Sequence, residues 1–104
     1  MEDCASGVPA KAIAGCTKLL KGKINKKSDQ SLVYSMRGLS YLNDGDPQNA
    51  IQDLEKAAAL NPKNFQAFQG LGFALQKTGL YPEAVSAFDK AIALNPSDHV
   101  TISY

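Results

Sequence analysis

The chain has 104 residues and a mass of 11.1 kDa, so it has room for one domain with a small core. Apolar residues make up 44% and charged residues 20%, which excludes an intrinsically disordered chain. A net charge of +1 gives no global field for nucleic acid or a membrane, and we expect neither nucleic-acid binding nor membrane insertion.

The spacing of apolar residues predicts a succession of amphipathic helices joined by short turns. The predicted helices cover residues 10–22, 30–43, 47–60, 64–77 and 81–94. Gly79 is placed to end a helix in the left-handed conformation. Asp46 is a predicted N-cap, and Pro47 and Pro82 follow where a first helical turn tolerates proline.

The sequence repeats itself with a fixed period, so that 31–64 align with 65–98 and share nine identical positions. The identical pairs are Gly38/Gly72, Gly45/Gly79, Ala50/Ala84, Lys56/Lys90, Ala57/Ala91, Ala59/Ala93, Leu60/Leu94, Asn61/Asn95 and Pro62/Pro96. A fixed period of this length indicates an array in which each unit stacks on its neighbour. We expect Gly38 and Gly72 to face alanines of the adjoining helix, so that the two helices approach closely.

These repeats resemble the tetratricopeptide repeat family. The second unit carries the resemblance at Phe68, Leu71, Gly72, Leu75, Ala84, Phe88, Ala91 and Pro96, and the first unit at Tyr34, Arg37, Gly38, Tyr41, Ala50, Leu54, Ala57 and Pro62. Arg37 replaces the usual leucine, which resembles a variant of many bacterial repeats. The resemblance implies an all-α fold of antiparallel helix-turn-helix repeats, stacked as a right-handed α-solenoid of about two and a half units.

We interpret residues 1–104 as a single domain of this kind. Its parts are an N-terminal arm with a partial repeat helix (1–28), a first unit (31–64), a second unit (65–98) and a C-terminal tail (99–104). Residues 10–22 align with the second helix of a repeat, with Cys16 matching Phe88. Residues 97–102 resemble the opening turn of a third unit.

The two cysteines, Cys4 and Cys16, enclose a short loop. A disulfide between them would tie the arm onto the first helix and contribute on the order of 3 kcal/mol. The spacing resembles a cysteine pair of exported bacterial repeat proteins, which implies the periplasm or another oxidising compartment, although the chain shows no signal peptide. The alternative is two reduced thiols in a cytoplasmic protein, with Cys16 packed as a small apolar residue.

No catalytic or metal-binding set is found in the sequence. Two cysteines and the distant His99 do not make the four-ligand set that zinc prefers, and no phosphate loop or nucleophile motif occurs. The acidic residues are expected at helix starts or on exposed faces; they are Asp44, Asp46, Asp53, Glu55, Glu83 and Asp89. We therefore predict a protein that is not an enzyme and needs no cofactor or metal.

The family resemblance implies that the first helix of each pair lines a concave groove that binds a partner. The residues that would line it are Leu32, Ser35, Leu39, Leu42, Asn43, Gln66, Gln69, Phe73, Gln76 and Lys77. Family members that grip a terminal carboxylate place basic and amide side chains at positions where this chain has Ser35, Leu39, Gln69 and Phe73, so that activity is not expected.

The predicted partner is a peptide or protein segment with apolar anchors, held over a floor of Leu39, Leu42 and Phe73 and a rim of amides. An apolar floor could instead be covered by the N-terminal arm or by a second copy of the chain. The alternative function is therefore a structural unit that forms homo-oligomers through uncapped repeat ends.

Overall fold

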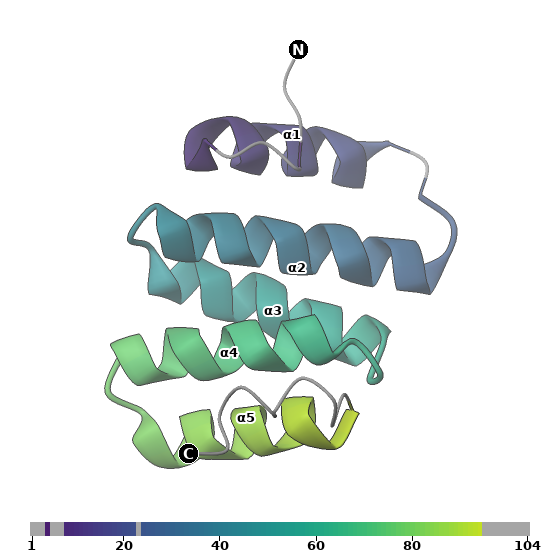
Figure 1. Ribbon diagram of the computed structural model, residues 1–104. Coiled ribbons are helices and arrows are strands. Elements are labelled where there is room, and N and C mark those ends of the chain that lie inside the picture. The colour runs from purple at the N-terminus through teal and green to yellow at the C-terminus, as the bar shows by residue number, and fades with distance from the viewer. Residues whose placement is uncertain (1–3, 5–7, 23, 95–104) are drawn as a thin grey trace.

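The computed structural model describes residues 4, 8–22 and 24–94, and within these it contains five α-helices and no strand (Figure 1). The helices are α1 (Pro9–Lys21), α2 (Lys27–Asn43), α3 (Pro47–Leu60), α4 (Phe65–Lys77) and α5 (Tyr81–Leu94). The predicted all-α fold is confirmed. The largest departure from the predicted bounds is the start of α2, which begins at Lys27 instead of residue 30.

Short turns with defined chemistry separate the helices. Gly45 and Gly79 follow α2 and α4 with φ angles of +81° and +83°, a conformation that favours glycine. The carboxylate of Asp46 accepts a hydrogen bond from the Asn49 backbone N–H at 3.3 Å, as expected of an N-cap. Asn64 caps α4 in the same way, accepting from the Ala67 N–H at 3.4 Å.

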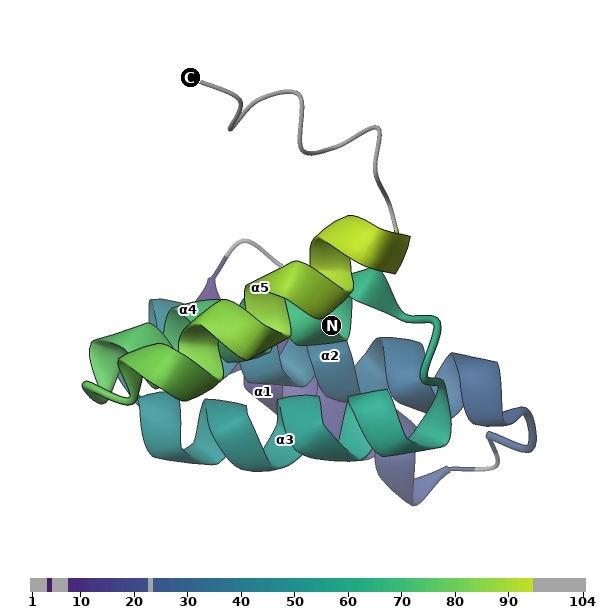
Figure 2. The same cartoon turned by 90° about the horizontal axis from the view of Figure 1, so that it is seen from below.

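The helices stack in chain order, and each packs against the next (Figure 1). In addition, α2 contacts α4, whereas α1, α3 and α5 do not contact one another within the described chain. Figure 2, which looks along the stack, shows α3 set to one side of α2 and α4. The structure is therefore a solenoid with two layers, and α2 and α4 form the continuous one.

Close contacts inside each repeat depend on glycine. A Cβ atom at Gly38 would lie 2.6 Å from Leu54 Cγ, and one at Gly72 would lie 2.6 Å from Phe88 Cε1. The expected approach of two helices is present, but the nearest atoms belong to Leu54 and Phe88 and not to the alanine side chains. Glycine is needed because a large side chain of the second helix lies directly over the first.

A partly buried ion pair joins α2 and α3 and is hydrogen-bonded to α1, and the expectation that Asp53 lies on an exposed face was wrong. Arg37 Nε and Nη2 donate to Asp53 Oδ2 and Oδ1 at 2.6 and 2.8 Å, and Nη1 donates to Thr17 Oγ1 at 3.1 Å. The hydrogen bond to Asp53 raises the pKa of Arg37 above its ordinary value, although burial opposes this shift. The guanidinium therefore stays charged and joins α1, α2 and α3.

The structure contains a disulfide between Cys4 and Cys16, with their Cα atoms 4.4 Å apart. Both cysteines are buried and pack against Val33, with Met36 partly buried beside them. The bridge therefore holds Cys4 against α1 and α2 at the N-terminal end of the stack.

Candidate protein-binding face

The ten residues that the sequence assigned to a groove belong to α2 and α4. Six of them are exposed: Leu32, Asn43, Gln66, Phe73, Gln76 and Lys77. Leu39, Leu42 and Gln69 are half-buried, and Ser35 is buried. The exposed set combines two large apolar side chains with amides and one lysine, a composition suited to apolar anchors flanked by hydrogen bonds.

Ser35 was expected on the exposed face and lies in the interior instead. Its hydroxyl donates to the Leu32 carbonyl oxygen at 2.7 Å, so the polar group is satisfied within its own helix and can be buried there. Ser35 therefore offers nothing to a partner on this face.

The predicted apolar floor is also smaller than expected. A Cβ at Gly70 would lie 3.0 Å from Leu39 Cδ2, so Leu39 packs against α4. Leu42 packs against the main core cluster. Of the three floor residues, only Phe73 is exposed, with 48% of its surface accessible.

Phe73 is exposed because of its position in the repeat. Its counterpart in the first unit is Leu39, which α4 covers, whereas no described helix follows α5 to cover Phe73. The Phe73 ring packs edge-on against Phe88, with centroids 5.1 Å apart and an interplanar angle of 82°.

The sequence analysis did not single out the apolar surface beside Phe73. Tyr81, Val85 and Phe88 follow one another at helical spacing along α5; Tyr81 and Val85 are exposed and Phe88 is half-buried. Together with Phe73 they form what we call the end face. The repeat alignment could have revealed it, because the counterparts Ile51 and Leu54 belong to the core around α3 and α4.

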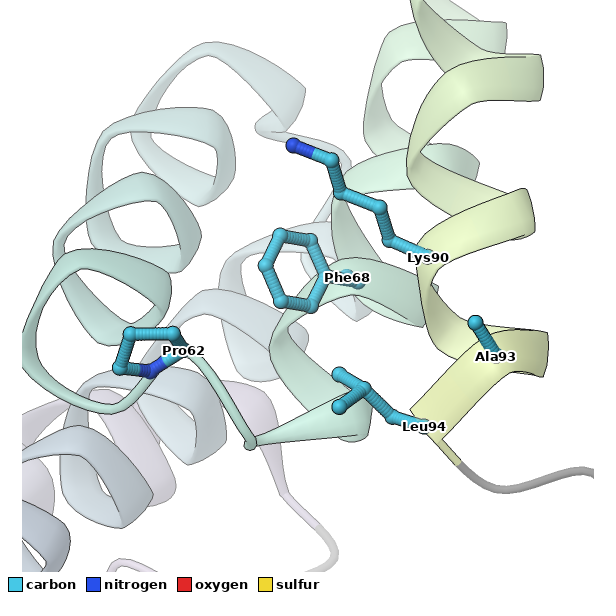
Figure 3. A pocket seen from close by; sticks show the side chains of 5 residues that line it. All are labelled: Pro62, Phe68, Lys90, Ala93 and Leu94. Carbon is cyan, nitrogen blue, oxygen red and sulfur yellow. The ribbon is translucent and has the colours of Figure 1, made fainter.

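A shallow hollow of about 320 Å³ lies between the start of α4 and the end of α5 (Figure 3). It is lined by Pro62, Phe68, Lys90, Ala93 and Leu94. The Lys90 Nζ atom lies 5.5 Å from the centre of the Phe68 ring, and Lys56 lies over Tyr34 in the same way at 5.3 Å in the first unit. Because the contact recurs in both repeats, it is part of the repeat packing.

Among the residues that the structure describes, no group of three or more His, Cys, Asp or Glu side chains could hold a metal ion. None of the described helices is long and apolar enough to cross a membrane. His99 and the residues that resemble a third unit lie outside the described part of the chain.

Helix pairs that recur with a fixed sequence period and stack on one another define an α-helical repeat protein of the solenoid class. The profile of the family described as tetratricopeptide repeat matches residues 35–99, which is more than half of the chain. The chain belongs to the tetratricopeptide repeat family.

Relatives share this repeat and are much longer. The chain is 36% identical over 80 residues to small glutamine-rich tetratricopeptide repeat-containing protein 2 of Mycosarcoma maydis, covering 76% of this chain and 23% of the relative. It is 42% identical over 60 residues to superkiller complex protein 3 of Homo sapiens, covering 58% of this chain and 4% of that protein. The chain thus spans a quarter or less of these two relatives.

A solved structure, the crystal structure of MamA, superimposes with a TM-score of 0.77 at 27% sequence identity. The match covers 86% of this chain and 50% of the MamA chain. The helical repeat architecture is therefore shared over nearly the whole described length.

Proposed function

We propose that this chain is a non-catalytic protein-interaction module that binds a peptide or protein segment along the face formed by α2 and α4. The supporting observation is the row of exposed residues on these two adjoining helices, with Leu32 and Phe73 as apolar contacts and Gln66 and Gln76 as hydrogen-bonding groups. Membership of a family of interaction modules supports the same function. A face with few apolar contacts fits a complex of about micromolar affinity, or roughly −8 kcal/mol.

Peptides selected from a random displayed library against the oxidised chain test this proposal. Substituting Leu32→Glu places a charge on the face, so the affinity of the selected peptides, measured by calorimetry, should fall at least about tenfold. Leu19→Glu is the matched control, because Leu19 is 47% exposed against 46% for Leu32 but lies on α1. Equal loss in both variants, or no loss in the Leu32 variant, would contradict the proposed face.

The second candidate function is self-assembly through the end face. The observation in its favour is the exposed apolar surface of Phe73, Tyr81 and Val85 on the end face. Light scattering at several concentrations separates the two functions: a stable monomer excludes self-assembly, and a mass that rises with concentration and falls in Val85→Glu supports it.

We further propose that the protein works in an oxidising compartment such as the periplasm. The support is the disulfide, in which both cysteines are buried and bonded to each other. Structural disulfides persist in exported proteins and are rare in the cytosol. A count of free thiols in native material, taken without reductant, tests this proposal: two free thiols would reject it.

A further inference from the structure

We propose that the C-terminal half of α1 is a second docking site, which binds a helical segment of a partner protein that carries one aromatic side chain flanked by acidic residues. The site is built on Lys18 and Leu19 and does not use the face formed by α2 and α4. In Figure 1, α2 lies along one side of α1, and no described helix lies along the other.

Helix α1 has the pattern of the second helix of a repeat, although no described helix precedes it. Cys16 is fully buried, as is Leu54 at the corresponding position of α3. In this register Lys18 corresponds to Lys56 of α3 and to Lys90 of α5. The same lysine therefore stands at one position of all three second helices.

In both complete units this lysine lies over an aromatic ring of the preceding helix. Lys56 Nζ is 5.3 Å from the centre of the Tyr34 ring, and Lys90 Nζ is 5.5 Å from the centre of the Phe68 ring. Figure 3 shows Lys90 reaching from α5 toward the Phe68 ring of α4. Lys18 is exposed and has no ring contact within the described chain. An aromatic side chain is thus the contact that α1 lacks.

The residue after this lysine shows the same gap. Ala57 is fully buried, and its carbonyl oxygen accepts a hydrogen bond from Ser31 Oγ of α2 at 2.6 Å. Leu19, its counterpart in α1, is 47% exposed. Ser31 and Tyr34 are three residues apart and lie on the same side of α2. A partner helix that fits α1 in the same way carries a small residue against Leu19 and an aromatic residue three positions later, because leucine fills more of the space than alanine does.

The charge around this surface gives the remaining chemistry of the partner. Residues 9–30 contain six lysines and one acidic residue, Asp29, and α1 itself contains no acidic residue. The five of these lysines that the structure describes are all exposed: Lys11, Lys18, Lys21, Lys26 and Lys27. None of the five forms an ion pair within the described chain. Acidic side chains beside the aromatic residue of the partner would complement this charge.

A synthetic helical peptide tests the proposal against the full oxidised chain. The probe is a lactam-stapled, alanine-based peptide with Ser and, three positions later, Tyr, and with Glu on either side. Calorimetry should show saturable binding, and the affinity should fall at least about tenfold in Leu19→Glu, which sets a charge against the contact. Leu32→Glu on α2, with 46% exposure of the leucine, is the matched control and should leave the affinity unchanged.

The contact between the lysine and the ring has a test of its own. Replacing Tyr of the peptide by Leu should weaken binding about threefold to the unmodified chain and have no further effect on Lys18→Gln. A loss of affinity in Leu32→Glu and not in Leu19→Glu would place the peptide on the face formed by α2 and α4 and overturn this proposal. The two leucine variants exchange roles between the two binding proposals, so each proposal can fail alone.

Nuclear magnetic resonance gives a readout that does not depend on the affinity. A ring over Lys18 should shift its Hε protons upfield, and this shift should vanish with the peptide in which Leu replaces Tyr. Binding without the shift would overturn the proposed contact. Nuclear Overhauser contacts between Leu19 and residues 1–3 of the free chain would overturn it too, because the chain would then cover the site itself. Binding to phosphatidylserine vesicles in place of the peptide would assign the lysines to a membrane surface and likewise reject the proposal.

Discussion

The ion pair between Arg37 and Asp53 allows a quantitative prediction, because the chain contains its apolar replacement. The corresponding positions of the second unit are Leu71 and Ala87, and both are buried, at 8% and 7% exposure. One packing site is thus filled by a charged pair in the first unit and by two apolar side chains in the second.

Asp53→Ala should therefore be costly alone and nearly harmless together with Arg37→Leu. Alone it leaves a guanidinium whose side chain is 18% exposed without its carboxylate, and breaking a buried pair in this way costs about 3–5 kcal/mol. Arg37 keeps Thr17 and the faces of Tyr34 and Tyr41, so we expect the lower limit, about 3 kcal/mol. The double variant restores the arrangement of the second unit and should lie within about 1 kcal/mol of the unmodified chain.

Urea unfolding followed by circular dichroism measures both free energies, with the disulfide kept oxidised. The coupling energy between the two substitutions should come out at about 2 kcal/mol or more. A cost below about 1 kcal/mol for Asp53→Ala would show that water replaces the carboxylate without penalty. A double variant as unstable as the single one would show that the first unit cannot accept the apolar pair, and either result refutes the reasoning.

The remaining predictions concern close packing and the disulfide. Gly38→Ala should destabilise the chain by about 1–3 kcal/mol, because the new Cβ meets the fully buried Leu54. Gly72→Ala should cost less, since its neighbour is the half-buried Phe88 ring on the end face. Equal shifts of the melting temperature in the two variants would contradict this. Cys4→Ser should lower the free energy of unfolding by on the order of 3 kcal/mol and abolish the effect of a reductant on the melting temperature. The control is the double Cys4→Ser and Cys16→Ser variant. A reductant effect that persists in the single variant would show that the bridge is not its source.

The helices and their order were predictable from local signals, because each turn contains residues whose chemistry is specific. Gly79 sits at a φ of +83°, and Asp46 caps the helix that it precedes. The start of α2 was less predictable: Lys26 is its N-cap without a side-chain hydrogen bond, so no capping residue marks the boundary.

The exposure of the candidate binding residues was predicted less well, because which side of a helix is covered depends on the neighbouring helices. Ser35 and Leu39 lie at positions that the family pattern leaves open, yet one is buried and the other packs against α4. Asp53 was misplaced for a different reason. The burial of Asp53 depends on its ion pair with Arg37, which lies on another helix. The only sign of this pairing in the sequence is that both positions are apolar in the second unit, where Leu71 and Ala87 replace them.

The two ends of the stack are held with different strength, and this follows from the same contacts. Helix α1 packs against α2, and its Thr17 hydroxyl accepts a hydrogen bond from the half-buried Arg37, while Cys16 fixes Cys4 beside it. Helix α5 packs against α4 alone among the described helices. Because each helix of a solenoid is stabilised mainly by its neighbours, α5 has the lower free energy of local opening. Among the described helices, the end face is therefore the place where a bound partner adds most to stability.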